Sequence, residues 1–142
     1  MYHKVVLVGN LGRDPEMRYT SDGTPVTSFS IATNEKWTGR DGGQQERTTW
    51  WRISAWRRLA ENCNQYLNTG SRVLVEGRMN SDPETGGPKT FTRNDGSVGA
   101  SYEVTALTVK FLSRRGDDVS SDVARDEDVP PEAGMDEDSI PF

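Results

Sequence analysis

Residues 47–56, RTTWWRISAW, carry three of the four tryptophans of the chain and place an arginine between them. In a β-strand, successive side chains point to opposite faces. One face of this stretch would then carry two indole rings and an arginine, from Trp50, Arg52, Ser54 and Trp56. The other face would be apolar or small, from Trp51, Ile53 and Ala55. The pattern predicts a strand that packs one face in the core, whereas the other face does not belong to the core.

Five further stretches have the β-branched or alternating composition of strands, namely residues 4–8, 17–20, 25–36, 71–79 and 101–112. We expect residues 17–20 and 25–36 to form a strand pair. After Trp56 the period changes, and Leu59, Ala60, Cys63 and Leu67 fall on one face of a short helix that Gly70 would end. About five strands, with one helix between the third and fourth, give the element order of an OB-fold. The sequence therefore predicts an all-β protein, a five-stranded Greek-key barrel with one short helix.

Two connections are rich in turn-forming residues. Residues 38–46, TGRDGGQQE, predict a mobile polar loop, and residues 79–100 predict a long, protruding hairpin or loop.

The charge is divided unevenly along the chain. Residues 1–116 carry 16 Lys and Arg against 12 Asp and Glu, whereas residues 117–142 carry one Arg against ten Asp and Glu. The net charge of -5 therefore combines a basic body with an acidic tail. The tail has too few apolar residues to offset its ordering entropy. We expect a domain over residues 1–113 and a disordered acidic tail over residues 114–142.

Proteins that bind single-stranded nucleic acid combine basic grooves that follow the phosphates with aromatic rings on which bases stack. Trp50, Arg52 and Trp56 on one strand face fit this description. Trp37 beside the polar loop and Phe91 in the long hairpin are further candidates. If the tryptophans were ordinary core residues instead, Arg52 would point into the core beside two of them.

At this point the chain resembles the bacterial single-stranded DNA-binding proteins over almost its whole length. The matching stretches, in the order of that family, are KVVLVGNLGRDPEMRYT, FSIATNEKW, TTWWRISAWRRLAEN, YLNTGSRVLVEGR and DEDSIPF. The resemblance implies an OB-fold, usually a homotetramer, that binds single-stranded DNA without sequence preference. It also implies protection of that DNA in replication, recombination and repair, with partner proteins recruited through the acidic C-terminal tip.

Carried over residue by residue, the resemblance assigns three groups. The stacking aromatics are Trp37, Trp50, Trp56 and Phe91. The basic residues that contact DNA are Lys4, Arg18, Arg52, Arg58 and Lys89. The partner-docking tip is formed by Asp136, Glu137, Asp138, Ile140, Pro141 and Phe142. The long 79–100 hairpin and Ser139, which stands where the family more often has an acid, depart from the family pattern.

Other functions were weighed against this one. An enzyme is disfavoured because GNLG lacks the lysine and hydroxyl of a phosphate loop, and because the dense acids lie in the tail. An interaction module with the tryptophans at a subunit contact, and an RNA binder, both stay open. The lone Cys63 and His3 predict no disulfide, metal site or cofactor. No apolar run approaches the ~20 residues of a membrane span, so we expect a cytoplasmic, nucleoid-associated protein.

Overall fold

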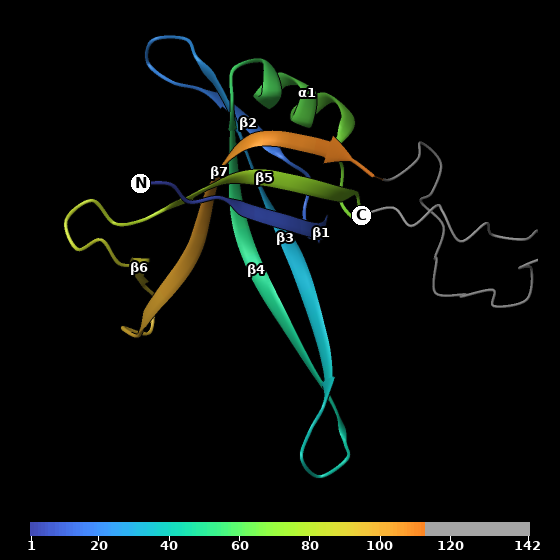
Figure 1. The fold of residues 1–142 in the computed structure, drawn as a ribbon. Coiled ribbons are helices and arrows are strands. Elements are labelled where there is room, and N and C mark those ends of the chain that lie inside the picture. Colours follow the sequence, from blue (N-terminus) through green and yellow to red (C-terminus); the bar gives the residue numbers. More distant parts are fainter. Residues whose placement is uncertain (113–142) are drawn as a thin grey trace, which may run out of the picture.

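The computed structural model describes residues 1–112, in seven strands and one helix (Figure 1). In chain order they are β1 (Val5–Leu11), β2 (Glu16–Tyr19), β3 (Pro25–Thr38), β4 (Gln44–Trp56), α1 (Arg58–Tyr66), β5 (Arg72–Asn80), β6 (Lys89–Thr92) and β7 (Val98–Phe111). The predicted acidic tail and its docking tip lie outside the described residues, and the domain boundary at residue 113 stays a prediction.

The strands close into a barrel of five, β1, β3, β4, β5 and β7. Neighbours in the sheet follow the order β1-β5-β7-β4-β3-β2, and β1 returns to pair with β3 at Asn10 and Leu11. All pairs are antiparallel except β4 with β7. The predicted OB-fold, with its helix between the third and fourth barrel strands, is confirmed. The strand pair predicted from residues 17–20 and 25–36 is β2 with β3.

The barrel interior is filled by the inward-facing residues of the alternating strands. Its fully buried aliphatic side chains are Ile31, Ile53, Val73, Val75 and Val104. Burial of a side chain of this size contributes roughly 1.5–3 kcal/mol. Each such residue is followed by one on the outer face, so the core fixes which side chains face solvent.

Helix α1 covers one end of the barrel with the face predicted from its spacing. Ala60 and Cys63 are fully buried, and Thr27 of β3 donates a hydrogen bond from Oγ1 to the carbonyl oxygen of Ala60, 2.7 Å away. Burial raises the pKa of the Cys63 thiol to about 11. The helix ends at Tyr66, before the predicted stop at Gly70, because Leu67 turns into an extended conformation and packs in the core.

The β3–β4 pair extends out of the barrel as a two-stranded arm, at the end opposite α1 (Figure 1). Pairing continues to Thr38 and Gln44, so only residues 39–43 form the connection. The N–H of Gly43 donates to the carboxylate of Asp41, 3.0 Å away, which fixes the turn. The loop predicted over residues 38–46 is therefore shorter, because cross-strand pairing extends farther than its composition indicated. We call residues 34–48 the β3–β4 arm.

The long connection predicted over residues 79–100 contains a second hairpin. Strand β6 pairs with the first residues of β7, from Lys89 opposite Ser101 to Thr92 opposite Val98. We call residues 89–101 the β6–β7 hairpin. Within residues 1–112, no helix is long and apolar enough to cross a membrane.

Arg57, which joins β4 to α1, has a backbone conformation that favours glycine, with φ of 60° and ψ of -130°. Such strain costs of order 1–3 kcal/mol in a residue other than glycine. Glycine would relieve it, but the greater freedom of glycine in the unfolded chain offsets roughly 0.5–1 kcal/mol of that gain. We therefore expect Arg57→Gly to raise the free energy of unfolding by about 1 kcal/mol, measured by urea denaturation. Arg57→Ala removes the same side chain but keeps the strain, so it should not stabilise the protein; equal gains from both variants would contradict this explanation.

Candidate nucleic-acid interface

The outer face of β4 carries large aromatic and basic side chains. Trp50, Arg52 and Trp56 are exposed there, whereas Ile53 and Ala55 between them are fully buried. Exposed indole rings are costly to leave in water unless they serve a contact. The alternation predicted from the sequence is thus present, and we call the outer surface around these three exposed residues the tryptophan face.

Small residues of β3 lie beside these large side chains. Ala32 is opposite Trp50, and Ser30 is opposite Arg52. The large side chains of β4 therefore have short neighbours on β3.

Trp50 is held from one side by the connection between β1 and β2. A methyl group at Gly12 would lie only 2.6 Å from Cζ3 of the ring, so the indole rests against the backbone of Gly12 and would have to shift if this residue carried a side chain. More than half of the Trp50 surface, 54%, remains exposed. The ring therefore has a supported edge and a surface open to a ligand.

Trp56 lies at the other end of the tryptophan face, next to basic residues. It is 42% exposed and pairs with Val26, which in turn pairs with Arg18 of β2. Arg58 follows two residues later as the first residue of α1 and is also exposed. The structure thus brings the predicted residues Arg18 and Arg58 to the neighbourhood of Trp56.

Trp37 lies in the β3–β4 arm, outside the barrel, and is 41% exposed. The guanidinium of Arg47 on the opposite strand lies over its ring, with Cζ 5.1 Å from the ring centre. Such cation–π contact holds the ring and places a positive charge at its face.

The β6–β7 hairpin carries a similar pair. Phe91 is 48% exposed, its ring lies over Gly99, and the guanidinium of Arg93 is 5.3 Å from the ring centre. Lys89 forms an ion pair with Glu103 of β7, with 3.0 Å between Nζ and Oε2. Glu103 pairs with Arg52 across the β4–β7 ladder, which places the base of this hairpin beside the tryptophan face.

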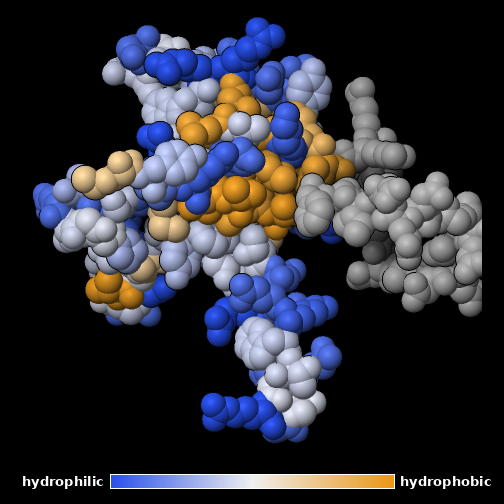
Figure 2. All heavy atoms as spheres, in the orientation of Figure 1, coloured by the Kyte–Doolittle hydropathy of each residue, from blue (hydrophilic) through white to orange (hydrophobic). Residues whose placement is uncertain are grey.

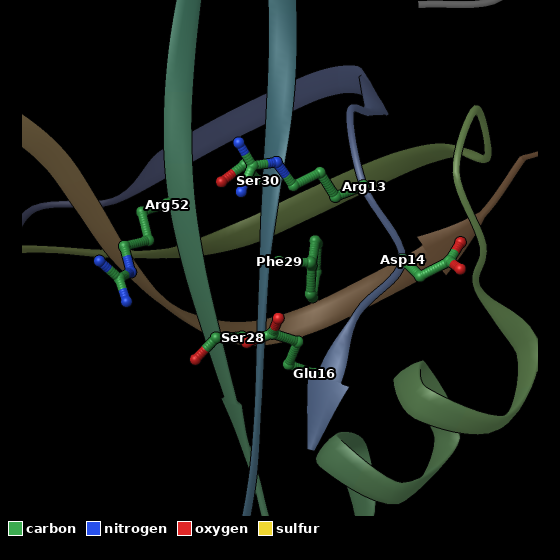
Figure 3. A pocket seen from close by; sticks show the side chains of 7 residues that line it. All are labelled: Arg13, Asp14, Glu16, Ser28, Phe29, Ser30 and Arg52. Atoms are coloured by element: carbon green, nitrogen blue, oxygen red, sulfur yellow. The ribbon is translucent and has the colours of Figure 1, made fainter. Parts of the chain in front are cut away.

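Two adjoining hollows lie between the β1–β2 connection and the outer face of β3 and β4. One has a volume of about 330 Å³ and is lined by Gly12, Arg13, Ser30 and Trp50. The other, of about 230 Å³, is lined by Arg13, Asp14, Glu16, Ser28, Phe29, Ser30 and Arg52 (Figure 3). Arg13 and Ser30 line both hollows, which therefore adjoin each other, and we call the two together the depression beside Trp50.

The charged residues around this depression differ in whether they already have a partner within the chain. Asp14 accepts hydrogen bonds from the backbone N–H and the hydroxyl of Thr69, each 2.8 Å long, and these bonds lower the pKa of its carboxyl group. In Figure 3 its carboxylate points away from Arg13 and Arg52. Within residues 1–112, no carboxylate oxygen lies within 4.0 Å of the guanidinium of Arg13 or Arg52.

Lys4 lies apart from the other predicted residues. It precedes β1 and forms an ion pair with Glu76 of β5, with 2.8 Å between Nζ and Oε2. The hydrogen bond and the charge of Glu76 raise the pKa of Lys4. The Lys4 side chain remains partly exposed beside Glu76, and its contact with DNA stays a prediction.

Trp51 lies on the inner side of the strand, as the alternation predicts. It is half-buried against the core, donates a hydrogen bond from Nε1 to Oγ1 of Thr33 at 2.9 Å, and packs its ring 5.1 Å from that of Tyr102. These contacts give Trp51 a packing role within the chain.

Three basic residues that the sequence analysis did not single out lie at the interface: Arg13, Arg47 and Arg93. The hairpin register could have indicated Arg47, because it pairs Trp37 with Gln45 and places Arg47 two residues farther along the same face, diagonal to the ring and within reach of a long side chain. Arg13 carries no comparable signal, because its approach to Trp50 depends on how a loop folds over a distant strand. Among residues 1–112, no group of three or more His, Cys, Asp or Glu residues is placed to hold a metal ion.

Residues 2–112 match the Single-strand binding protein family. The chain belongs to this family. A single-stranded DNA-binding protein of Neisseria meningitidis serogroup A is 41% identical over 115 residues, which are 81% of this chain and 62% of that protein. Single-stranded DNA-binding protein 1 of Xylella fastidiosa strain 9a5c is 34% identical over 91% of this chain and 90% of its own length.

Solved structures of the family agree with the fold. The Plasmodium falciparum SSB in complex with ssDNA is 25% identical, with a TM-score of 0.65 over 80% of this chain and 97% of that chain. The small single-stranded DNA-binding protein from Streptomyces coelicolor is 24% identical, with a TM-score of 0.62, and shows the shared fold. The chain spans 58 to 62% of the length of three curated relatives that it matches.

Proposed function

We propose that this family member binds single-stranded DNA without sequence preference, through base stacking and phosphate contacts. The observation that carries the proposal is the tryptophan face, where Trp50 and Trp56 flank Arg52 on the outside of the barrel, all three exposed. Every base has a π-face, so stacking on a ring serves any sequence and contributes about 1–3 kcal/mol per base. In duplex DNA these π-faces are covered by neighbouring base pairs, so the same rings favour unpaired strands.

The two hairpins extend this surface. Trp37 on the β3–β4 arm and Phe91 on the β6–β7 hairpin each present an exposed ring with an arginine over it. An arginine beside a stacking ring can neutralise the phosphate that flanks the stacked base. Arg18, Arg58 and Lys89 supply the remaining positive charge predicted from the sequence. We infer a binding role for this surface and no catalytic one.

We further propose that the chain assembles as a homotetramer. Val6 and Val8 on the outer face of β1 are 56% and 51% exposed, and they belong to an apolar surface over β1, β5 and β7 (Figure 2). β1 pairs with β5 on one side, whereas its first residues, Val5 to Gly9, have no strand partner on the other among residues 1–112. An apolar strand with a free edge supports contact with a second copy of the chain. Several barrels joined in this way would bind one DNA strand with greater avidity.

The acidic tail completes the proposal. We infer that residues 136–142 recruit replication, recombination and repair proteins, because the acids are followed by Ile140, Pro141 and Phe142 at the end of the chain. A protein pocket with an apolar slot and a basic rim can bind such a run of acids followed by apolar residues. We infer that a protein with this function works in the cytoplasm, at the nucleoid.

Trp50→Ala and Trp56→Ala should each weaken binding of an oligothymidylate by about 1–3 kcal/mol, because each removes one stacking ring. Binding is measured by fluorescence anisotropy of the labelled DNA. Tyr66→Ala is the matched control, because it removes a ring that is 62% exposed on α1, outside the tryptophan face. Folded Trp50→Ala and Trp56→Ala proteins that bind as tightly as the control would refute the stacking role.

The intact protein should have a mass close to four chains of 15.8 kDa in native mass spectrometry. Val8→Glu should lower this mass, because it places a charge on the apolar surface of β1. Val98→Glu introduces the same charge on the β6–β7 hairpin, where Val98 is 68% exposed, and should leave the assembly intact. A monomeric wild-type protein would rule out the tetramer and leave the proposed DNA binding standing.

Deleting residues 134–142 should leave the affinity for single-stranded DNA equal or slightly higher, because the tip carries negative charge that competes with DNA. The same deletion should abolish binding to replication and repair proteins, measured by co-purification from cells. An internal deletion of residues 119–127 removes the same number of residues, keeps the tip and should retain those partners. Loss of DNA binding on deletion of 134–142, or unchanged capture of partners, would contradict these roles.

A further inference from the structure

The depression beside Trp50 contains a basic residue that neither stacking nor the family resemblance assigns. Arg13 lines both hollows, together with Ser30, and Arg52 lines the second of them from β4. Figure 3 shows the Arg13 side chain extending from the β1–β2 connection toward β3 and β4. Two arginines from different segments of the chain therefore line the second hollow, and in Figure 3 the Arg52 guanidinium extends to the other side of β4 from Arg13.

The local chemistry suits an anion. Ser28 and Ser30, which carry hydroxyl groups, also line the second hollow. Guanidinium groups present several N–H donors in a planar arrangement that matches phosphate oxygens. Asp14 and Glu16 also line this hollow, but Asp14 is engaged by Thr69, which leaves Glu16 as the acid available to oppose an anion.

The segment that carries Arg13 is fixed on both sides. The N–H of Gly12 donates to the carbonyl oxygen of Ser30 at 3.1 Å, and Asp14 is tied to Thr69. The backbone of Arg13 is thus positioned before any ligand arrives, so binding would not have to order the loop. The ring of Trp50 rests on Gly12, next to Arg13 in the chain, so any base on that ring would lie close to Arg13.

We propose that Arg13 binds a phosphodiester of the single strand in the hollow that it shares with Arg52, adjacent to the base stacked on Trp50. This inference rests on the proposed binding of single-stranded DNA and adds a specific phosphate site to it. Arg13 holds the backbone of the strand in place while Trp50 holds the base, so the two contacts act on the same part of the ligand.

The test is a salt titration of binding to a short oligothymidylate, with the logarithm of the association constant plotted against the logarithm of salt concentration. Each phosphate that is neutralised on a single strand contributes a slope of about -0.7. Arg13→Gln should therefore reduce the size of the slope by about 0.7 and weaken binding roughly tenfold at low salt, as expected for one charged hydrogen-bonded contact. Arg13→Lys keeps the charge, so it should retain the slope and lose only part of the affinity.

Two further variants give the controls. Lys110→Gln removes one positive charge from an exposed position on β7 that pairs with Leu74, outside both hollows, and should leave slope and affinity close to wild type. Glu16→Gln removes the opposing acid and should raise the affinity. Circular dichroism confirms that each variant is folded.

An Arg13→Gln protein with the slope and affinity of Lys110→Gln would overturn the phosphate site while the proposed function stands. Weaker binding by Glu16→Gln would also count against it, because a phosphate in this hollow is repelled by that carboxylate. If the wild-type protein itself binds no oligothymidylate, the proposed function fails and the phosphate site fails with it.

Discussion

The antiparallel register of β3 and β4 determines most of what this protein presents to a ligand. Phe29 pairs with Ile53 inside the barrel, and Ser30 pairs with Arg52 outside it. Because side chains alternate with a period of two, a slip of one residue would bury Arg52 and expose Ile53. Because burial of the core residues fixes this register, it also keeps the rings of Trp50 and Trp56 on the outer surface. The barrel itself therefore positions the side chains of the tryptophan face.

Local contacts also restrain individual side chains and loops on this outer surface. Gly12 supports the edge of Trp50, and the bonds from Asp14 to Thr69 tie the same connection to the segment that follows α1. On the hairpins, Arg47 and Arg93 lie over their rings. Trp50, Trp37 and Phe91 therefore each have a neighbour that restricts the motion of the ring, which would lower the entropy lost if a base stacks on it.

The sequence predicts the parts of the fold that follow from periodicity. The faces of residues 47–56, the strand pair after residue 17 and the buried face of α1 all agree with the structure, because burial depends on spacing along one element. The end of α1 at Tyr66 and the length of the β3–β4 arm differ, because tertiary packing of Leu67 and cross-strand pairing override local composition. The ion pair of Lys4 and the approach of Arg13 to Trp50 depend on contacts between distant segments, which a single sequence does not reveal.

The β3–β4 arm and the β6–β7 hairpin leave the barrel in different directions (Figure 1), and each carries an exposed ring. A ligand that touched both rings and the tryptophan face would have to change course within the span of this one domain. Duplex DNA resists bending over a persistence length of about 500 Å, whereas an unpaired strand turns at each nucleotide. The divergence of the two arms therefore selects by mechanical stiffness, in addition to any chemical preference for unpaired bases.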